Sequence, residues 1–303
     1  MKNFFEDTVM IEIIKAVLYG ILEGITEWLP VSSTGHLILL EEILPLKVAP
    51  ELGEQFAAEY FSMFEVVIQL GAILAVVVMF FGKLNPFSPK KDGAQKRSTW
   101  VLWAKVAVAS IPAALIGIVG DKILEKLSGK DIDGWIYNWQ VVAAALIIYG
   151  ALFIIIEKAH KNKESRVVSV DDISFSQAAL VGCFQALSIV PGTSRSGSTI
   201  LGSRFLGISR SAAAEFSFFL GIPAMAGASL IKGYSFFDFV LENDIAVPTA
   251  AWVVLAIACV VAFAVSMVAI KFLMDFVKKH SFAPFGVYRI ILGAVVILWF
   301  VMR

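Results

Sequence analysis

The sequence predicts an all-α integral membrane protein, and its composition and its long apolar stretches are the observations behind this prediction. Of the 303 residues, 58% are hydrophobic and only 17% are charged, whereas roughly 25% are charged in an ordinary soluble domain. The mean hydropathy is +0.81. This composition excludes that the protein is a cytosolic enzyme or a disordered scaffold. The net charge of 0 provides no basic field for nucleic acid, so no nucleic-acid partner is expected.

Six stretches are long and apolar enough to cross a membrane, because a spanning helix needs about 20 such residues. They are 64–82, 100–120, 139–156, 212–231, 249–272 and 284–302. Three of the connecting loops, 83–98, 157–175 and 273–283, are rich in Lys and Arg, which favour the cytoplasmic side. We therefore expect a multi-pass plasma-membrane protein, a single membrane domain over 1–303, with both termini outside.

Two further apolar regions, 16–44 and 176–207, are interrupted in the middle by short polar segments. The interruptions are 30–35 (PVSSTG) and 191–197 (PGTSRSG). Irregular backbone at membrane depth is tolerated only where protein or a water-filled cavity satisfies its polar groups. These regions are therefore expected to form re-entrant helix–loop–helix hairpins, the first from outside and the second from the cytoplasm.

The two hairpin regions resemble each other, which indicates an internal repeat. The matching pairs are Gly20 and Glu23 with Gly182 and Gln185, Pro30-x-Ser32-Ser33 with Pro191-x-Thr193-Ser194, and Glu65 and Gly71 with Glu215 and Gly221. The first repeat would cover 12–156 and the second 176–302, each with one hairpin and three spans. Three is odd, so the second repeat would be inverted, an architecture familiar from secondary transporters.

The first hairpin carries two carboxylates on one helix face, because Glu23 and Glu27 are four residues apart. Two carboxylates this close in an apolar setting need a shared proton, a metal ion or another cation. His36 follows directly on a run of hydroxyl residues, and an imidazole suits acid–base catalysis. We interpret these three residues as candidates for chemistry.

The second hairpin has the features of an anion site. Gly192 and Gly197 allow backbone N–H groups to turn inward, and Arg195 provides a planar fork that suits phosphate oxygens. The partner of Arg195 is expected to be the carboxylate face or an anionic ligand, with both hairpin tips meeting near the membrane centre. Elsewhere, structural roles are favoured for Glu65 and Glu215, snorkelling to the cytoplasm for Arg289, and interfacial anchoring for Trp28.

The two interruptions resemble the signatures of a known family. The segment 23–36 (EGITEWLPVSSTGH) is similar to the first signature of the bacterial undecaprenyl-diphosphate phosphatase family, also called bacitracin-resistance proteins, and 191–197 is similar to the second. The likeness extends over about residues 12–302. It implies removal of the terminal phosphate from undecaprenyl diphosphate in the bacterial inner membrane, with the site towards the outer face. It also implies a divalent cation, and Glu23 and Glu27 are the matching ligands.

The resemblance and the residues together suggest specific roles. The expected catalytic residues are Glu23, Glu27, Ser33, His36 and Arg195. The expected diphosphate-binding residues are Ser32, Thr34, Gly192, Thr193, Ser194, Arg195, Ser196 and Gly197. The cation is expected to be Mg²⁺ or Ca²⁺, since carboxylates and substrate phosphates suit both. The attacking group is Ser33 or a water molecule; the sequence leaves this choice open, as it does a homodimer.

Three other functions are weighed against this one. Membrane lipid phosphatases of the acid-phosphatase type need a histidine six residues after an arginine, but Leu201 and Phe216 follow Arg195 and Arg210 at that spacing. A lipid-carrier flippase or an anion transporter is the remaining alternative, because it fits the inverted repeat. Transport alone would not need a histidine beside hydroxyls and paired carboxylates. A purely structural scaffold leaves the buried polar residues unexplained.

Overall fold

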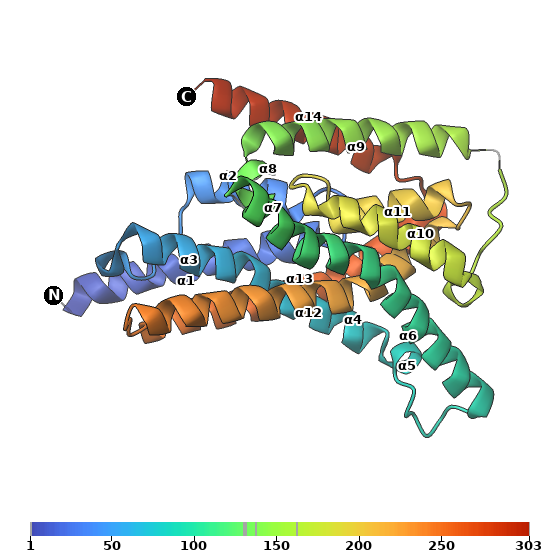
Figure 1. The fold of residues 1–303 in the computed structure, drawn as a ribbon, viewed down its shortest axis with the longest axis horizontal. Helices are drawn as coiled ribbons and strands as arrows, with labels where there is room; N and C mark the ends of the chain where they lie inside the picture. The colour runs from blue at the N-terminus through green and yellow to red at the C-terminus, as the bar shows by residue number, and fades with distance from the viewer. Residues whose placement is uncertain (1, 130–131, 137, 162, 303) are drawn as a thin grey trace.

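The computed structural model describes residues 2–129, 132–136, 138–161 and 163–302, and this part of the chain is almost entirely helical (Figure 1). The first half contains α1 (Lys2–Thr26), α2 (Ser33–Ile43), α3 (Gly53–Val67), α4 (Gln69–Met79), α5 (Phe81–Leu84), α6 (Gly93–Ala114), α7 (Asp121–Ser128), α8 (Ile132–Ile136) and α9 (Trp139–Ala159). The second half contains α10 (Phe175–Ala186), α11 (Arg195–Phe205), α12 (Arg210–Glu242), α13 (Thr249–Lys279) and α14 (Ala283–Val301).

Within the described residues, six helical segments are long and apolar enough to cross a membrane, which confirms the expected number. They are Pro50–Met79, Gly93–Ser128, Trp139–Ala159, Arg210–Glu242, Thr249–Lys279 and Ala283–Val301. Several begin before the apolar stretch that predicts them, because polar caps start the helix earlier. For example, Asp92 and Gln95 form a capping box at the start of α6.

Two further helix pairs, α1–α2 and α10–α11, are interrupted close to the predicted positions, but the breaks between the α-helices come earlier, at 27–32 and 187–194. The predicted bounds are shifted because 33–35 and 195–197 already form the first turn of α2 and α11. Each second helix begins in the same way. Ser32 (φ 75°) caps α2 and its hydroxyl accepts from the Gly35 N–H, while Ser194 (φ 69°) caps α11 and accepts from the Gly197 N–H. The matching caps make Ser32 the structural counterpart of Ser194. Aligning Pro30 with Pro191 had instead paired Ser194 with Ser33, so the two correspondences differ by one residue.

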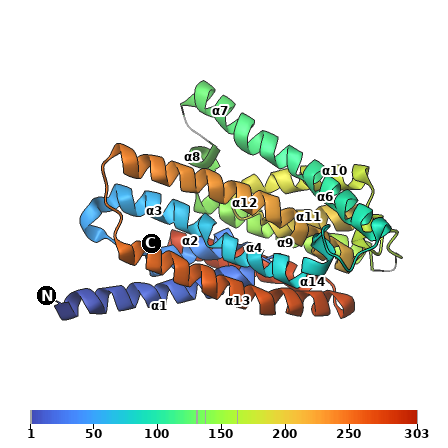
Figure 2. The same cartoon turned by 90° about the horizontal axis from the view of Figure 1, so that it is seen from below.

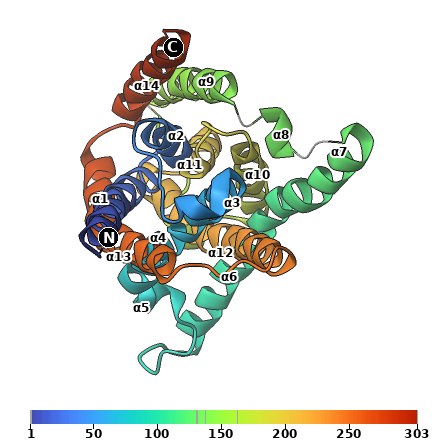
Figure 3. The ribbon, with the colours of Figure 1, turned by 90° about the vertical axis from the view of Figure 1, so that its left-hand side faces the viewer.

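The first helix of each pair packs against a helix of the other half of the chain. α1 lies along α13 and α10 lies along α6, while α9 and α14 pack together (Figure 3). Glycines allow both close approaches: a Cβ at Gly20 would lie 2.6 Å from the Ala258 carbonyl oxygen, and one at Gly182 would lie 2.3 Å from that of Ala109. Each pair therefore packs against the second spanning helix of the other half.

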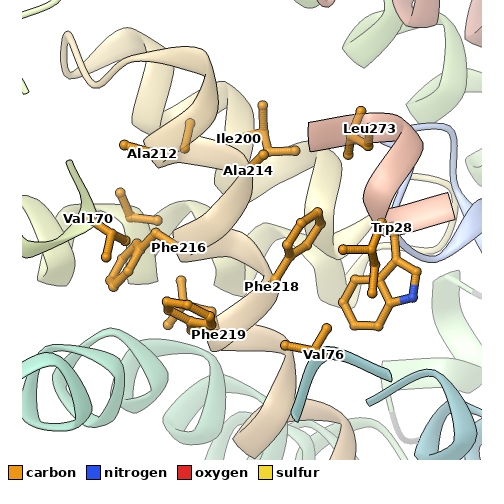
Figure 4. Packing of buried hydrophobic residues seen from close by; sticks show 14 of the residues in the cluster. Trp28, Val76, Val170, Ile200, Ala212, Ala214, Phe216, Phe218, Phe219 and Leu273 are labelled. Atoms are coloured by element: carbon orange, nitrogen blue, oxygen red, sulfur yellow. The ribbon is translucent and has the colours of Figure 1, made fainter. Parts of the chain in front are cut away.

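The main buried cluster surrounds α12, where Phe216, Phe218 and Phe219 point towards neighbouring helices (Figure 4). Trp28 is part of it, is fully buried and meets Phe218 edge to face at 5.3 Å. Interfacial anchoring of Trp28 is therefore wrong, because the break after α1 turns its ring inward. Lipid tails are as apolar as these side chains, so close packing is what stabilises the cluster.

The three basic loops lie at one end of the molecule, opposite both termini (Figures 1 and 2). The α12–α13 connection and the α2–α3 connection lie at the other end. α1–α2 and α10–α11 reach towards each other from these two ends, so their loops meet in the middle of the bundle. This arrangement positions the site.

Candidate functional site

The two loops are joined by an ion pair and a hydroxyl contact, and Ser33 of the first hairpin bonds to the same glutamate. Arg195 Nη2 lies 2.8 Å from Glu27 Oε1. Ser33 Oγ donates to Glu27 Oε2 at 2.8 Å, and Ser196 Oγ donates to the Glu27 carbonyl oxygen at 2.9 Å. Four of the residues singled out in the sequence are thus brought together, with Glu27 at the centre and both loops contributing.

The Arg195 guanidinium is held on several sides. Its Nη1 donates to the Ser217 carbonyl oxygen at 2.7 Å, and its Cζ lies 5.6 Å from the Trp28 ring centroid, within cation–π range. Gly221 of α12 leaves the necessary space, since a Cβ there would lie 2.8 Å from Nη2. The buried Nε has no hydrogen-bond partner among the described residues, so one donor of the fork is available.

Glu23 is the most unusual group at the site. Its side chain is fully buried, and neither carboxylate oxygen has a hydrogen-bond partner in the part of the chain that the structure describes. It interacts electrostatically with Glu27, Glu65 and Arg195. A buried carboxylate without a partner is costly and calls for a proton or a cation.

The acidic residues that could hold a metal ion are few. Across the described residues, no group of three or more His, Cys, Asp or Glu side chains is arranged to hold one. Glu23 and Glu27 can therefore offer carboxylate oxygens but no complete protein cage. The donor set fits a hard cation that keeps water or substrate oxygens among its ligands, as Mg²⁺ commonly does.

His36 is hydrogen-bonded to groups outside this cluster. Its Nδ1 is 2.6 Å from the Ser32 carbonyl oxygen and its Nε2 is 2.6 Å from the Tyr288 hydroxyl. A carbonyl can only accept, so Nδ1 carries a proton. Sequence reasoning did not single out Tyr288 as a site residue, although its segment, with Pro284, Phe285 and Arg289, resembles the family and could have drawn attention to it.

Arg289 is fully buried, so its interpretation as a snorkelling residue is wrong. Its Nη2 donates to the carbonyl oxygens of Gly192 (2.7 Å) and Thr193 (2.9 Å), and its Nη1 donates to that of Pro30 (3.2 Å). These carbonyls lie in irregular loops, where no helical N–H group donates to them, and the guanidinium provides the missing donors. Arg289 therefore ties the two loops to each other.

The remaining predicted residues have local roles in this structure. The Thr193 N–H donates to the Val190 carbonyl oxygen and the Gly197 N–H to Ser194 Oγ, whose hydroxyl lies 3.2 Å from Ser196 Oγ. Thr34 is half-buried next to the Ser32 cap. Their binding of a phosphate stays a prediction.

Glu215 and Glu65 have different surroundings despite their matching positions. Glu215 forms an ion pair with Lys83 at 3.0 Å, near the basic end. This contact agrees with the structural role that the sequence favours for it. Glu65 belongs to the charged surroundings of Glu23, so this half of the pair is part of the site's electrostatics.

Comparison with known proteins gives consistent matches over nearly the full chain. The family described as bacitracin resistance protein BacA matches residues 16–295. An undecaprenyl-diphosphatase of Enterococcus faecalis is 50% identical, over 93% of this chain and 95% of its own length. One from Lactiplantibacillus plantarum is 47% identical, over 97% and 99%. One from Streptococcus gordonii is 50% identical, over 97% of each chain.

Proposed function

We infer, because this chain belongs to the bacitracin resistance protein BacA family, that it is an undecaprenyl-diphosphatase of the membrane. It hydrolyses undecaprenyl diphosphate to undecaprenyl phosphate and inorganic phosphate. This recycles the lipid carrier for cell-wall synthesis and confers resistance to bacitracin. In the structure, the observation that best supports this activity is the Glu27–Arg195 ion pair across the two loops, with Ser33 bonded to the same carboxylate.

Arg195 is proposed to bind the diphosphate. A guanidinium suits phosphate oxygens because its donors lie in one plane, and here it is fixed by Ser217 and Trp28 before any substrate arrives. Such preorganisation stabilises charge that develops in the transition state. The hydroxyl and N–H groups of the 192–197 loop are proposed to contact the remaining oxygens.

Glu23 and Glu27 are proposed to hold a divalent cation, Mg²⁺ or Ca²⁺. The unpartnered oxygens of buried Glu23 support this assignment. When bound, the ion would polarise the phosphoryl oxygens and neutralise their charge. Glu65 adds negative charge nearby, which favours a cation in this place.

Ser33 is proposed as the nucleophile, in preference to water, because its Oγ already donates to Glu27 Oε2. Glu27 would take the hydroxyl proton while Oγ attacks the terminal phosphorus. The bond from that phosphorus to the bridging oxygen then breaks, and undecaprenyl phosphate leaves. Water would hydrolyse the resulting phosphoserine to release phosphate. His36 and Tyr288 are proposed to pass protons at the edge of the site.

The membrane placement is part of the proposal. We take α1–α2 and α10–α11 as re-entrant hairpins of an inverted repeat, supported by their matching serine caps and by the packing of each against the other half of the chain. The three basic loops at one end support a cytoplasmic location of that end in a bacterial inner membrane. The site would then open towards the outer face, where the polyprenyl tail can lie in the bilayer.

The test is phosphate release from undecaprenyl diphosphate by the purified protein in detergent, with EDTA and after returning Mg²⁺ or Ca²⁺. We expect release that EDTA stops and one of the ions restores. In a rapid quench with labelled terminal phosphate, label on the wild-type protein and its absence in Ser33→Ala would support the covalent route. Normal turnover of Ser33→Ala would exclude that route. Lipid movement in liposomes without phosphate release would favour the flippase.

A further inference from the structure

A second cluster of charged side chains lies at the basic end, away from the site. Glu157 at the end of α9 is bonded to two arginines: Arg204 Nε at 3.0 Å and Arg210 Nη2 at 2.5 Å. The Arg204 and Glu157 side chains are 5% and 2% exposed. One buried carboxylate thus faces two guanidiniums, and the triad keeps one positive charge.

The position of Arg210 at a helix N-terminus adds to this excess of positive charge. It is the first residue of α12, a helix of 33 residues. The N-terminal end of a helix carries about half a positive charge and disfavours cations. An arginine there is expected only where an anion compensates it, and Glu157 is already shared with Arg204.

A cavity of about 260 Å³ opens on the two arginines of this triad. Arg204 and Arg210 line it, together with Lys161, Lys163 and Lys278 from the neighbouring loop and helix end. Ser165 and Ser211 add neutral donors, whereas the hydroxyl of Ser209, which also lines the cavity, already donates to the Val168 carbonyl oxygen. Of the lining lysines, Lys278 is paired with Asp275 at 2.9 Å.

A second cavity that includes apolar side chains adjoins this one. This neighbouring cavity of about 380 Å³ shares His160 and Lys163 with the first and is lined by Phe205 and Leu206. The Phe205 side chain is 63% exposed. Basic pockets beside apolar helices at the cytoplasmic side suit lipid phosphate groups. A headgroup could lie in the basic cavity with its acyl chain along Phe205.

We propose that this cavity is a second anion site, which binds a phosphate group, most readily that of an anionic phospholipid headgroup. It is separate from the catalytic site, because α11 lies between them. Arg195 begins this helix and Arg204 is near its end, about 14 Å away at 1.5 Å per residue. This proposal does not depend on the proposed catalytic mechanism, so it can be tested by measuring binding without measuring phosphate release.

The test compares lipid binding by two double variants. Lys161→Ala/Lys163→Ala removes two exposed charges of the cavity and leaves the buried triad intact. Lys90→Ala/Arg97→Ala removes two exposed charges at the same end, from the loop before α6 and from the start of α6, outside the cavity. Native mass spectrometry of the full-length protein in detergent would be recorded with phosphatidylglycerol and, separately, with phosphatidylcholine. Thermal unfolding in detergent checks that both variants are folded.

We expect the wild type to retain phosphatidylglycerol in preference to phosphatidylcholine. The cavity variant should bind it about 10- to 30-fold more weakly, and the control variant should match the wild type. Calorimetry with inorganic phosphate distinguishes the sources: binding that only the cavity variant loses would show that free phosphate also fills the site. Equal binding by all three proteins, or an equal loss in both variants, would overturn the proposal.

Discussion

Gly221→Ala is a substitution that tests the placement of Arg195 without removing any polar group. The added Cβ would lie 2.8 Å from Arg195 Nη2 and 2.9 Å from both Cζ and Nη1. Unstrained contacts between heavy atoms begin at about 3.5 Å, so the guanidinium has to retreat by about 0.7 Å. Its bonds to Glu27 and to the Ser217 carbonyl, 2.8 Å and 2.7 Å long, cannot both survive this shift.

A displacement of about 1 Å at a catalytic group can cost 10²-fold in rate. We therefore expect Gly221→Ala to lower kcat for phosphate release by about 10- to 100-fold. The matched control is Gly227→Ala on the same helix, where a Cβ would meet no atom within 4 Å. It should keep full activity and unfold at the same or a slightly higher temperature. Full activity in a well-folded Gly221→Ala protein would refute the argument.

Three further predictions concern individual residues. Tyr288→Phe removes the hydroxyl 2.6 Å from His36 Nε2; we expect kcat to fall about 10-fold or more with little change in thermal unfolding, and an unchanged kcat would exclude the proposed proton path. Arg289→Lys keeps the charge but cannot reach all three loop carbonyls. Activity should fall, and each carbonyl left unpaired should lower the free energy of unfolding by about 1–3 kcal/mol, which a lower melting temperature would reveal. A wild-type melting curve would contradict the proposal that Arg289 holds the two loops together. Gly182→Ala places a Cβ 2.3 Å from the Ala109 backbone oxygen; α10 and α6 must separate, so the protein should lose stability in a detergent melt, and unaltered stability would show that the two helices do not pack this closely.

Much of the fold follows from the sequence because bilayer thickness fixes the length of an apolar helix. The six spans could be predicted for this reason. The two interruptions could be located approximately from their polar residues, although the helices that follow begin before the predicted ends of the interruptions. The meeting of the two loops was expected from charge alone, since Arg195 had no local counter-ion and Glu27 lay on the other hairpin. The ion pair between them agrees with that reasoning.

Other features depend on tertiary packing that no local pattern reveals. Arg289 resembles a snorkelling residue in sequence, and only the three carbonyls of the distant loops make its burial favourable. Trp28 lies near a helix end but turns inward against Phe218. The Tyr288–His36 contact joins residues from opposite ends of the chain, which sequence periodicity cannot predict.

The central claim is that both hairpin tips form one phosphatase site, and a double-mutant cycle tests it most directly. Glu27→Gln, Arg195→Gln and the double variant would be compared with the wild type for phosphate release in detergent, as kcat/KM. Residues that act as a unit are strongly non-additive, so the account predicts that the double variant is about as slow as the slower single variant. Losses that multiply would mean that Glu27 and Arg195 act independently, and would contradict a shared site.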